Sequence, residues 1–312
     1  MAASTATTDV FLSGKYKTVL ISVDTSSSGL VNPPPKPLLI GSPAEVAGEF
    51  PVMVLLHGYM METSFYSQLI QHVSSHGYIM VAPQLYTCAA SDSTDDINAA
   101  AATTNWLSQG LAAVLPSQVS ANLAKLVLAG HSRGGKGAFA LALGKSSTPL
   151  ALSFSALLGI DPVDGTASCC CKFQTKPPVL TKVAQSFDLN MPVMVVGSGL
   201  GEDKKYKVFP ACAPKGLNHA AFFEECRSPA WHFVAKDYGH MDMLDDDTKG
   251  IRGVVSYCMC ENGSSREPMR RFVGGAAVAF LRAYVGGDDG DLMALQDTPD
   301  IAPVQITVEA RL

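Results

Sequence analysis

Residues 125–145 read KLVLAGHSRGGKGAFALALGK, and this stretch decides the fold. Its first six residues form an apolar run of strand length, and the residues from 134 onward have the spacing of a helix. Between the two lies Gly130-His131-Ser132-Arg133-Gly134, which matches the G-x-S-x-G pattern of a nucleophile elbow. The glycines are needed because side chains beside such a tight strand-to-helix turn would collide with neighbouring elements. The stretch therefore predicts an α/β protein with Ser132 as its nucleophile.

Apolar runs of strand length alternate with helix-like stretches on both sides of this motif. Their near-continuous apolar character fits strands buried on both faces, expected at 51–58, 78–85, 154–161, 191–199 and 231–237. Helices are expected at 64–77, 100–115 and 266–285. This alternation is typical of a mostly parallel sheet with helices on both faces. We predict a single domain over 1–312, with a lid-like insertion at 200–230 and a weakly structured tail at 287–312.

Composition excludes several classes of function. The 312 residues carry a net charge of −5 without a basic block, which argues against nucleic-acid binding. No apolar run approaches the ~20 residues that a membrane-spanning helix requires. The first 17 residues lack the apolar core of a signal peptide; they are rich in Ser and Thr but contain no Arg, so they make no clear transit peptide either.

A serine hydroxyl needs a base to take its proton. Where a serine elbow opens a helix, the catalytic groups follow in the order serine, acid, histidine, so the base must lie late in the chain. Three histidines qualify, at positions 219, 232 and 240. His219 falls in the predicted insertion and His232 within a strand, whereas His240 follows the last predicted strand in a loop. We therefore predict that His240 is the base.

The sequence offers three candidates for the acid that orients the histidine. Asp161 ends the apolar run 154–161 and is followed by Pro162, which favours a rigid position. Glu202 and Asp203 follow the next predicted strand, but they lie between glycines and lysines in what reads as a solvated loop. Asp161 is favoured, and the other two remain alternatives.

The oxyanion of an acyl-transfer intermediate needs two hydrogen-bond donors. One is the backbone N–H of the residue after the nucleophile, here Arg133, whose side chain we expect to make a surface ion pair. The other is expected from the loop that follows the strand ending at Gly58. Tyr59 is the favoured donor in that loop, and Met60 is the alternative.

No motif calls for a cofactor or a metal. The glycine string at 197–201 has the wrong spacing for a dinucleotide loop, and no phosphate loop is present. Eight cysteines include a Cys-Cys-Cys triplet and a Cys-x-Cys pair, neither of which has the spacing of a zinc site. Without a secretory signal we expect free thiols, and a Cys212–Cys226 disulfide remains open.

Four longer segments carry a family resemblance: GHSRGGKGAFALALG (130–144), SHGYIMVAPQL (75–85), FSALLGIDPVDGT (154–166) and KDYGHMDMLDDD (236–247). They resemble the chlorophyllases, whose nucleophile lies in Gly-His-Ser-Arg-Gly-Gly. The resemblance covers the chain from about the 40s to the 280s, including the Cys-x-Cys pair near 258. It implies the α/β-hydrolase fold, a triad of Ser132, Asp161 and His240, and hydrolysis of the phytyl ester of chlorophyll to chlorophyllide and phytol.

A phytyl ester implies an apolar groove. Met60, Met61, Phe65 and Tyr66 follow the oxyanion loop and, with Tyr59, are predicted to line it, although Phe65 suits helix packing equally well. The resemblance also implies a chlorophyll or related phytyl-ester pigment as substrate, no cofactor, and peripheral contact with membranes.

Two questions stay open from the sequence. The family implies a chloroplast, but the N-terminal residues leave the cytoplasm or the surface of the endoplasmic reticulum as alternatives. The same triad would also serve a general lipid esterase or an acyltransferase, and the scaffold could instead belong to a ligand receptor.

Overall fold

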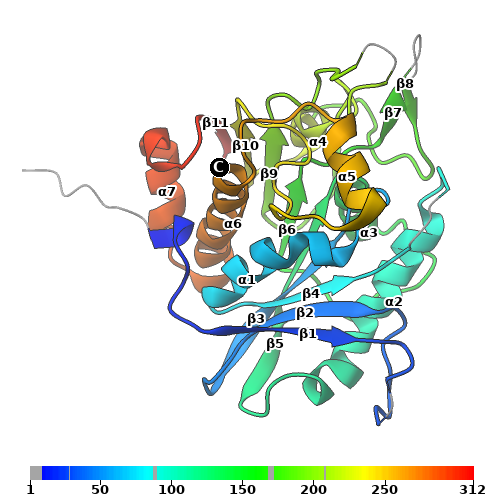
Figure 1. Ribbon diagram of the computed structural model, residues 1–312, viewed down its shortest axis with the longest axis vertical. Coiled ribbons are helices and arrows are strands. Elements are labelled where there is room, and N and C mark those ends of the chain that lie inside the picture. The colour runs from blue at the N-terminus through cyan, green and yellow to red at the C-terminus, as the bar shows by residue number, and fades with distance from the viewer. Residues whose placement is uncertain (1–8, 28, 87–89, 168–171, 207–208) are drawn as a thin grey trace, which may run out of the picture.

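The computed structural model describes residues 9–27, 29–86, 90–167, 172–206 and 209–312. Within these residues, nine strands form one sheet in the order β1-β2-β4-β3-β5-β6-β9-β10-β11 (Figure 1). The strands are β1 (Thr18–Val23), β2 (Leu38–Pro43), β3 (Gly48–Leu56), β4 (Ile79–Pro83), β5 (Val119–His131), β6 (Ala156–Ile160), β9 (Val193–Ser198), β10 (Ala230–Ala235) and β11 (Ile306–Arg311). A small antiparallel hairpin, β7 (Gly165–Ala167) with β8 (Lys172–Gln174), lies outside this sheet.

The centre of the sheet is parallel and its edges are antiparallel. All pairings from β4 through β3, β5, β6 and β9 to β10 are parallel. β1, β2 and β11 pair antiparallel at the two edges. A mostly parallel sheet covered by helices was predicted from the sequence, and this prediction is confirmed.

Helices cover both faces of the sheet. In β3 the side chains of Met53 and Leu55 join the core under α1 and α6, whereas Val54 and Leu56 join the core under α2 and α3. Both sides of β3 are buried, which explains its unbroken apolar sequence. The α-helices are α1 (Ser67–Ser75), α2 (Thr94–Gly110), α3 (Arg133–Ala142), α4 (His219–Glu225), α5 (Gly250–Met259), α6 (Glu267–Leu281) and α7 (Gly290–Asp297). Shorter turns are η1 (Asp9–Phe11), η2 (Thr63–Tyr66), η3 (Leu111–Ala113), the π-helical η4 (Arg282–Gly286) and η5 (Pro299–Ile301).

The prediction of a weakly structured tail at 287–312 is wrong. The tail forms α7 and then β11, which pairs with β10 over six residues. Leu292 and Leu295 of α7 are buried in the core. The Arg311 guanidinium donates to the carbonyl oxygens of Phe223 and Cys226, each at 2.7 Å. Burial and strand pairing together hold the C-terminus on the sheet.

The cysteines pair differently from the arrangement left open above. Cys212 forms a disulfide with Cys260, which closes a loop containing α4, β10 and α5. Cys226 is a free, buried thiol, and burial raises its pKa to about 12. A pairing of Cys212 with Cys226 is therefore wrong, and so is the expectation that all thiols are free. Four other cysteines, at 88 and 169–171, lie outside the described residues.

The insertion at 200–230 is packed in its second half. Phe222 and Phe223 of α4 are buried in the core beside α3, and Phe222 lies with its ring centroid 4.8 Å from that of Phe139. A lid function for this insertion stays a prediction. Along the described part of the chain, none of the helices combines the length and the apolar character needed to cross a membrane.

Candidate active site

Ser132 stands on a strained turn between β5 and α3. Its backbone has φ 56° and ψ −122°, a conformation that non-glycine residues rarely adopt. The flanking glycines are required by space: a Cβ at Gly130 would lie 2.2 Å from the Gly134 carbonyl oxygen, and a Cβ at Gly134 would lie 2.2 Å from that of Leu56. The Ser132 N–H donates to the Ile160 carbonyl at 3.0 Å, which fixes the turn against β6.

Ser132, His240 and Asp161 form a continuous hydrogen-bonded chain. The Ser132 hydroxyl lies 2.8 Å from His240 Nε2, and His240 Nδ1 lies 2.7 Å from Asp161 Oδ2. Since Asp161 accepts from Nδ1–H, Nε2 is left to accept from the serine hydroxyl. All three side chains are buried, the serine being the most accessible at 8%. The structure thus brings together the three residues that the sequence placed in the triad.

The Asp161 carboxylate is held in its charged form. Burial on its own raises the pKa of a carboxyl group, but His240 and the Ser198 hydroxyl hold the pKa of Asp161 at about 2. Ser198, at the end of β9, donates to Oδ2 through its hydroxyl and to Oδ1 through its N–H at 3.4 Å. A buried anion beside His240 would stabilise an imidazolium. Sequence reasoning missed Ser198, although it closes the same strand that precedes Glu202.

The alternative acids and bases have other hydrogen-bond partners or face solvent. Glu202 accepts a hydrogen bond from the Asn218 amide at 2.9 Å, and Asp203 is exposed. His219 Nδ1 and His232 Nε2 lie 2.8 Å apart, and burial of the His232 ring lowers its pKa to about 3.

A buried network below the triad was not predicted from the sequence. The Tyr66 hydroxyl accepts from the Gly58 N–H at 3.0 Å and lies 2.7 Å from His131 Nδ1. His131 Nε2 lies 3.0 Å from the His240 carbonyl oxygen, to which it donates. Burial lowers the pKa of His131 to about 3 and raises that of Tyr66, so both are neutral at pH 7. The network connects the loop after β3, the turn that carries Ser132 and the backbone of His240.

The loop that carries His240 is pinned by a second carboxylate. Asp242 Oδ2 accepts from the Gly239 N–H at 2.7 Å and from the Gly263 N–H at 2.6 Å. Close packing also demands glycine at 239, because a Cβ there would lie 1.8 Å from the Glu261 carbonyl oxygen. These contacts hold the backbone on one side of His240, while His131 holds its carbonyl.

The loop after β3 lies against Ser132. A Cβ at Gly58 would be 3.3 Å from the Ser132 Cβ. The Gly58 carbonyl accepts from the Tyr86 hydroxyl and from the Met61 N–H, both at 3.1 Å. Met60 has φ 55°, so this loop too holds a residue in the left-handed region. Tyr59 is half-exposed, and its ring faces the Arg133 guanidinium at 5.8 Å.

The Arg133 side chain does not make the surface ion pair that was expected. It is buried and pairs with Asp96 at 2.7 Å. The same guanidinium donates to the carbonyls of Ala90 at 2.6 Å and Asp92 at 2.7 Å. Arg133 therefore fastens the chain before α2 onto the nucleophile turn.

Three of the residues predicted to line an apolar groove belong to the core. Met61, Phe65 and Tyr66 are each at most 5% exposed and pack in the hydrophobic cluster beneath α1 and α6. The prediction that they line a groove is therefore wrong. Phe65 and Tyr66 belong to η2, and Met61 lies two residues before it. Tyr59 and Met60 retain partly accessible side chains.

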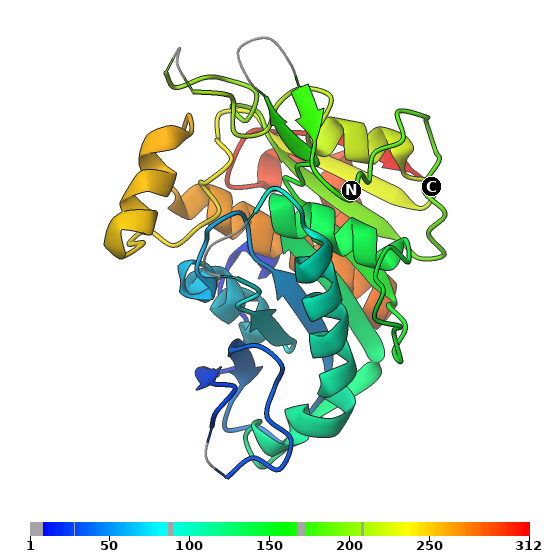
Figure 2. The ribbon, with the colours of Figure 1, turned by 90° about the vertical axis from the view of Figure 1, so that its right-hand side faces the viewer.

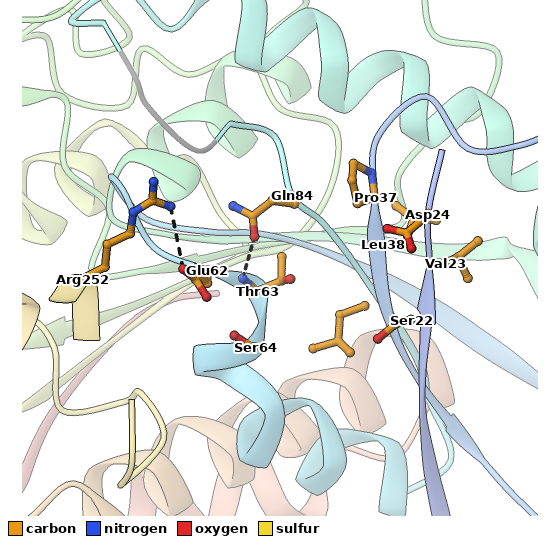
Figure 3. Close-up of a pocket in the computed structure, with 11 residues that line it drawn as sticks. Ser22, Val23, Asp24, Pro37, Leu38, Glu62, Thr63, Ser64, Gln84 and Arg252 are labelled. Atoms are coloured by element: carbon orange, nitrogen blue, oxygen red, sulfur yellow. Dashed lines mark hydrogen bonds and ion pairs between the residues drawn. The ribbon is translucent and has the colours of Figure 1, made fainter. Parts of the chain in front are cut away.

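A cleft of about 300 Å³ opens beside residues 62–64, which follow the loop after β3 (Figure 3). Its walls come from the end of β1, the start of β2, η2 and α5. In Figure 3 the Gln84 amide oxygen accepts from the Thr63 N–H at 2.9 Å, and Arg252 reaches to Glu62 at 3.8 Å. No triad residue lines this cleft, so it is separate from the reacting groups. Its lining residues are Ser22, Val23, Asp24, Pro37, Leu38, Leu39, Glu62, Thr63, Ser64, Gln84 and Arg252.

Comparison with known proteins gives a consistent result across nearly the whole chain. A family model described as Chlorophyllase matches residues 6–311. Chlorophyllase-2 of Arabidopsis thaliana is 54% identical over 97% of this chain and 98% of its own length. Chlorophyllase-1 of the same plant is 44% identical over 97% of this chain and 93% of its own. Chlorophyllase-1, chloroplastic, of Citrus unshiu is 43% identical over 97% and 88%, respectively.

Proposed function

The chain belongs to the chlorophyllase family, and on that premise we propose that it hydrolyses the phytyl ester of chlorophyll to chlorophyllide and phytol. The observation that carries the proposal is the unbroken line of hydrogen bonds from Ser132 through His240 to Asp161. An oriented base and a hydroxyl in contact are what acyl transfer to serine requires. An intact triad also argues against a ligand receptor built on this scaffold.

In the first half of the reaction, Ser132 Oγ attacks the ester carbonyl carbon and its proton passes to His240 Nε2. The buried Asp161 carboxylate stabilises the imidazolium and holds its ring in place. The tetrahedral intermediate then collapses, and the C–O bond to phytol breaks. His240 gives its proton to the leaving alkoxide, so phytol departs as a neutral alcohol and chlorophyllide remains as an ester on Ser132.

In the second half, water replaces the alcohol. His240 takes a proton from the water as its oxygen attacks the acyl-enzyme carbonyl. Collapse of the second intermediate breaks the bond to Ser132 Oγ, which recovers the proton from His240. Chlorophyllide leaves as a free acid, and one water molecule has been consumed. The substrate's magnesium takes no part in these steps.

The negative oxygen of both intermediates needs donors beside Ser132. One proposed donor is the backbone N–H of Arg133. Arg133 is the first residue of α3, and the helix dipole favours negative charge at this end of the helix. The N–H of Tyr59, in the loop against the Ser132 Cβ, is the proposed second donor, with Met60 as the alternative. Each donor is typically worth about 3 kcal/mol of transition-state stabilisation.

The long alkyl chain of a phytyl ester calls for apolar contacts on the protein and for access to lipid. Of the residues expected to line an apolar groove, Tyr59 and Met60 keep accessible side chains and are proposed to contact the phytyl ester. A pigment with such a chain resides in lipid, so peripheral contact with a membrane is part of the proposal.

We also propose a chloroplast location, as two citrus relatives are named chloroplastic. Imaging of a fluorescent fusion in leaf cells tests the compartment, and a signal confined to the cytosol or endoplasmic reticulum would contradict it.

The direct test is hydrolysis of purified chlorophyll dispersed in detergent, with chlorophyllide and phytol separated and measured. Wild-type protein is expected to form both products in equal amounts, and Ser132→Ala to form neither. Short-chain esters assayed in parallel distinguish the alternatives. Fast turnover of short esters with no chlorophyllide would indicate a general esterase. Turnover that is unchanged in Ser132→Ala would remove the serine mechanism.

A further inference from the structure

Helix α5 presents an apolar stripe to the outside of the molecule. Its apolar side chains recur at positions i, i+3, i+4, i+7 and i+8, which is the spacing of a single helix face. In a soluble protein such a face normally packs on the core. Every side chain of the stripe on α5 is nevertheless exposed, that of Ile251 by 83%. The members are Ile251, Val254, Val255, Cys258 and Met259.

The outward orientation is fixed by contacts on the other side of the helix. The Arg252 guanidinium reaches Glu62 at 3.8 Å, as Figure 3 shows. The Tyr257 carbonyl accepts from Lys205 Nζ at 3.2 Å. The first residue after the helix, Cys260, is joined to Cys212 by the disulfide. In Figure 2 the helix lies at the left edge of the molecule, away from the sheet. These contacts tie α5 to the rest of the molecule, while its apolar stripe faces outward, unlike that of a helix packed on the core.

The stripe borders the loops that hold the proposed catalytic groups. α5 follows directly on the segment that carries His240, and Glu62 belongs to the segment after the loop against Ser132. The neighbouring segment adds two exposed aromatic rings, those of Tyr206 and Phe209, whose centroids lie 6.2 Å apart. Aromatic residues of this kind favour the boundary between a membrane and water.

The charges of α5 also suit a lipid surface. Residues 250–259 contain no carboxylate, and their one charged side chain is the cationic Arg252. Nothing on α5 therefore repels phospholipid headgroups, and its apolar stripe can insert among the acyl chains. A protein that takes a phytyl ester must also meet its substrate where that ester dissolves.

We infer that α5, together with Tyr206 and Phe209, docks the protein on the surface of a lipid bilayer, with the proposed catalytic loops facing that surface. The inference rests on the proposed function for the choice of a lipid partner. It adds which element of the fold makes the contact and which way the molecule is turned.

The test is binding to pigment-free phosphatidylcholine vesicles, measured by flotation of the intact protein. Wild type is expected to float with the vesicles. The double variant Ile251→Asp/Val254→Asp is expected to bind at least tenfold more weakly, since two apolar anchors become charges. The matched control is Val31→Asp/Val183→Asp, which places two aspartates at exposed apolar positions elsewhere (95% and 60% exposed, against 83% and 61%). The control should float as wild type does.

Each contrary outcome overturns the inference in its own way. Wild type that does not float, or a control that is impaired as much as the α5 variant, removes α5 as the docking element. If gel filtration shows a dimer that only the α5 variant breaks, a second copy covers the stripe instead. If flotation is unchanged but hydrolysis of detergent-dispersed chlorophyll falls, the helix is a substrate lid. Flotation uses no pigment, so a protein that binds vesicles through α5 but cleaves no chlorophyll would refute the proposed function alone.

Discussion

Replacing Tyr66 by Phe tests whether the buried network beneath Ser132 supports both the fold and the site. The change keeps the fully buried ring and removes only the hydroxyl, so no large cavity forms. Two groups lose their partner: the N–H of Gly58 and Nδ1 of His131, now bonded at 3.0 and 2.7 Å. Both lie where water does not reach, because His131 has no exposed surface and Gly58 is buried.

The expected cost follows from those two groups. A buried polar group left without a partner costs about 1–3 kcal/mol, so the free energy of unfolding should fall by about 2–6 kcal/mol. Activity should fall as well, because Gly58 begins the loop of the proposed oxyanion donor and His131 holds the His240 carbonyl at 3.0 Å. We expect kcat for a water-soluble ester to drop at least about tenfold, the equivalent of 1.4 kcal/mol in the barrier.

Tyr284→Phe provides the matched control. The Tyr284 hydroxyl accepts from Trp231 Nε1 at 2.8 Å, so this variant also removes one bonded hydroxyl but leaves the site untouched. Urea unfolding gives the two stability changes, and steady-state kinetics gives the two rates. If Tyr66→Phe costs no more stability than Tyr284→Phe and retains full kcat, the network has no positioning role and the reasoning fails.

Three further outcomes follow from the structure. Asp161→Asn should keep its circular dichroism spectrum but lose about 10⁴-fold in kcat; a near-normal rate would move the acid to Glu202 or Asp203. Burial lowers the pKa of His57 to about 4 and of His131 and His232 to about 3. The unfolded chain binds these protons near pH 6.5 and the folded chain does not, so stability present above pH 6.5 is lost as pH falls toward 4. Near pH 5 these three histidines should cost about 4 kcal/mol per pH unit. Burial also lowers the pKa of His72 to about 4, which adds to the loss, and raises that of Asp245 to about 6, which opposes it. Urea midpoints that do not change between pH 7 and 5 would contradict the prediction. Gly134→Ala should give insoluble or inactive protein, because its Cβ would meet the Leu56 carbonyl at 2.2 Å; a soluble variant with normal kcat would show that the turn tolerates a side chain.

The sequence predicts the central sheet well because its strands are buried on both faces. An unbroken apolar run such as that of β3 has few alternatives to a central strand. The same logic places Ser132 after β5, Asp161 after β6 and His240 after β10, since parallel strands end at one edge of the sheet. Chain order and strand ends therefore bring Ser132 and His240 together, and they narrow the acid to Asp161, Glu202 or Asp203 without choosing among them.

Side-chain direction is harder to predict than position along the chain. Phe65 and Tyr66 follow the oxyanion loop, which suggested contact with a substrate, but Leu69 and Ile70 repeat their apolar character four residues later. That i, i+4 spacing is the signal of a helix face that packs on the core, and it outweighs proximity to the motif. At the C-terminus, residues 306–311 alternate in the manner of an edge strand, a signal that the acidic residues before them obscure. Disulfide pairing had no such signal, because it depends on how far apart the folded chain places two cysteines.

The strained backbone conformations at the site are a feature that residue propensities do not predict. Ser132, Asp161 and Met60 all have positive φ, at 56°, 41° and 55°, and all lie in segments that follow central strands at the site. Such conformations cost about 1–3 kcal/mol each in non-glycine residues, so sequence propensity argues against them. Hydrogen bonds around the site offset this cost: the Ser132 N–H bonds to β6, and the Asp161 N–H bonds to the Val196 carbonyl of β9 at 2.6 Å. A strained residue at a strand end persists only where its neighbours hold the backbone on both sides. The rigidity that aligns the hydroxyl, imidazole and carboxylate therefore comes from the adjacent strands, and variants that loosen β6 or β9 should misalign the triad before they unfold the sheet.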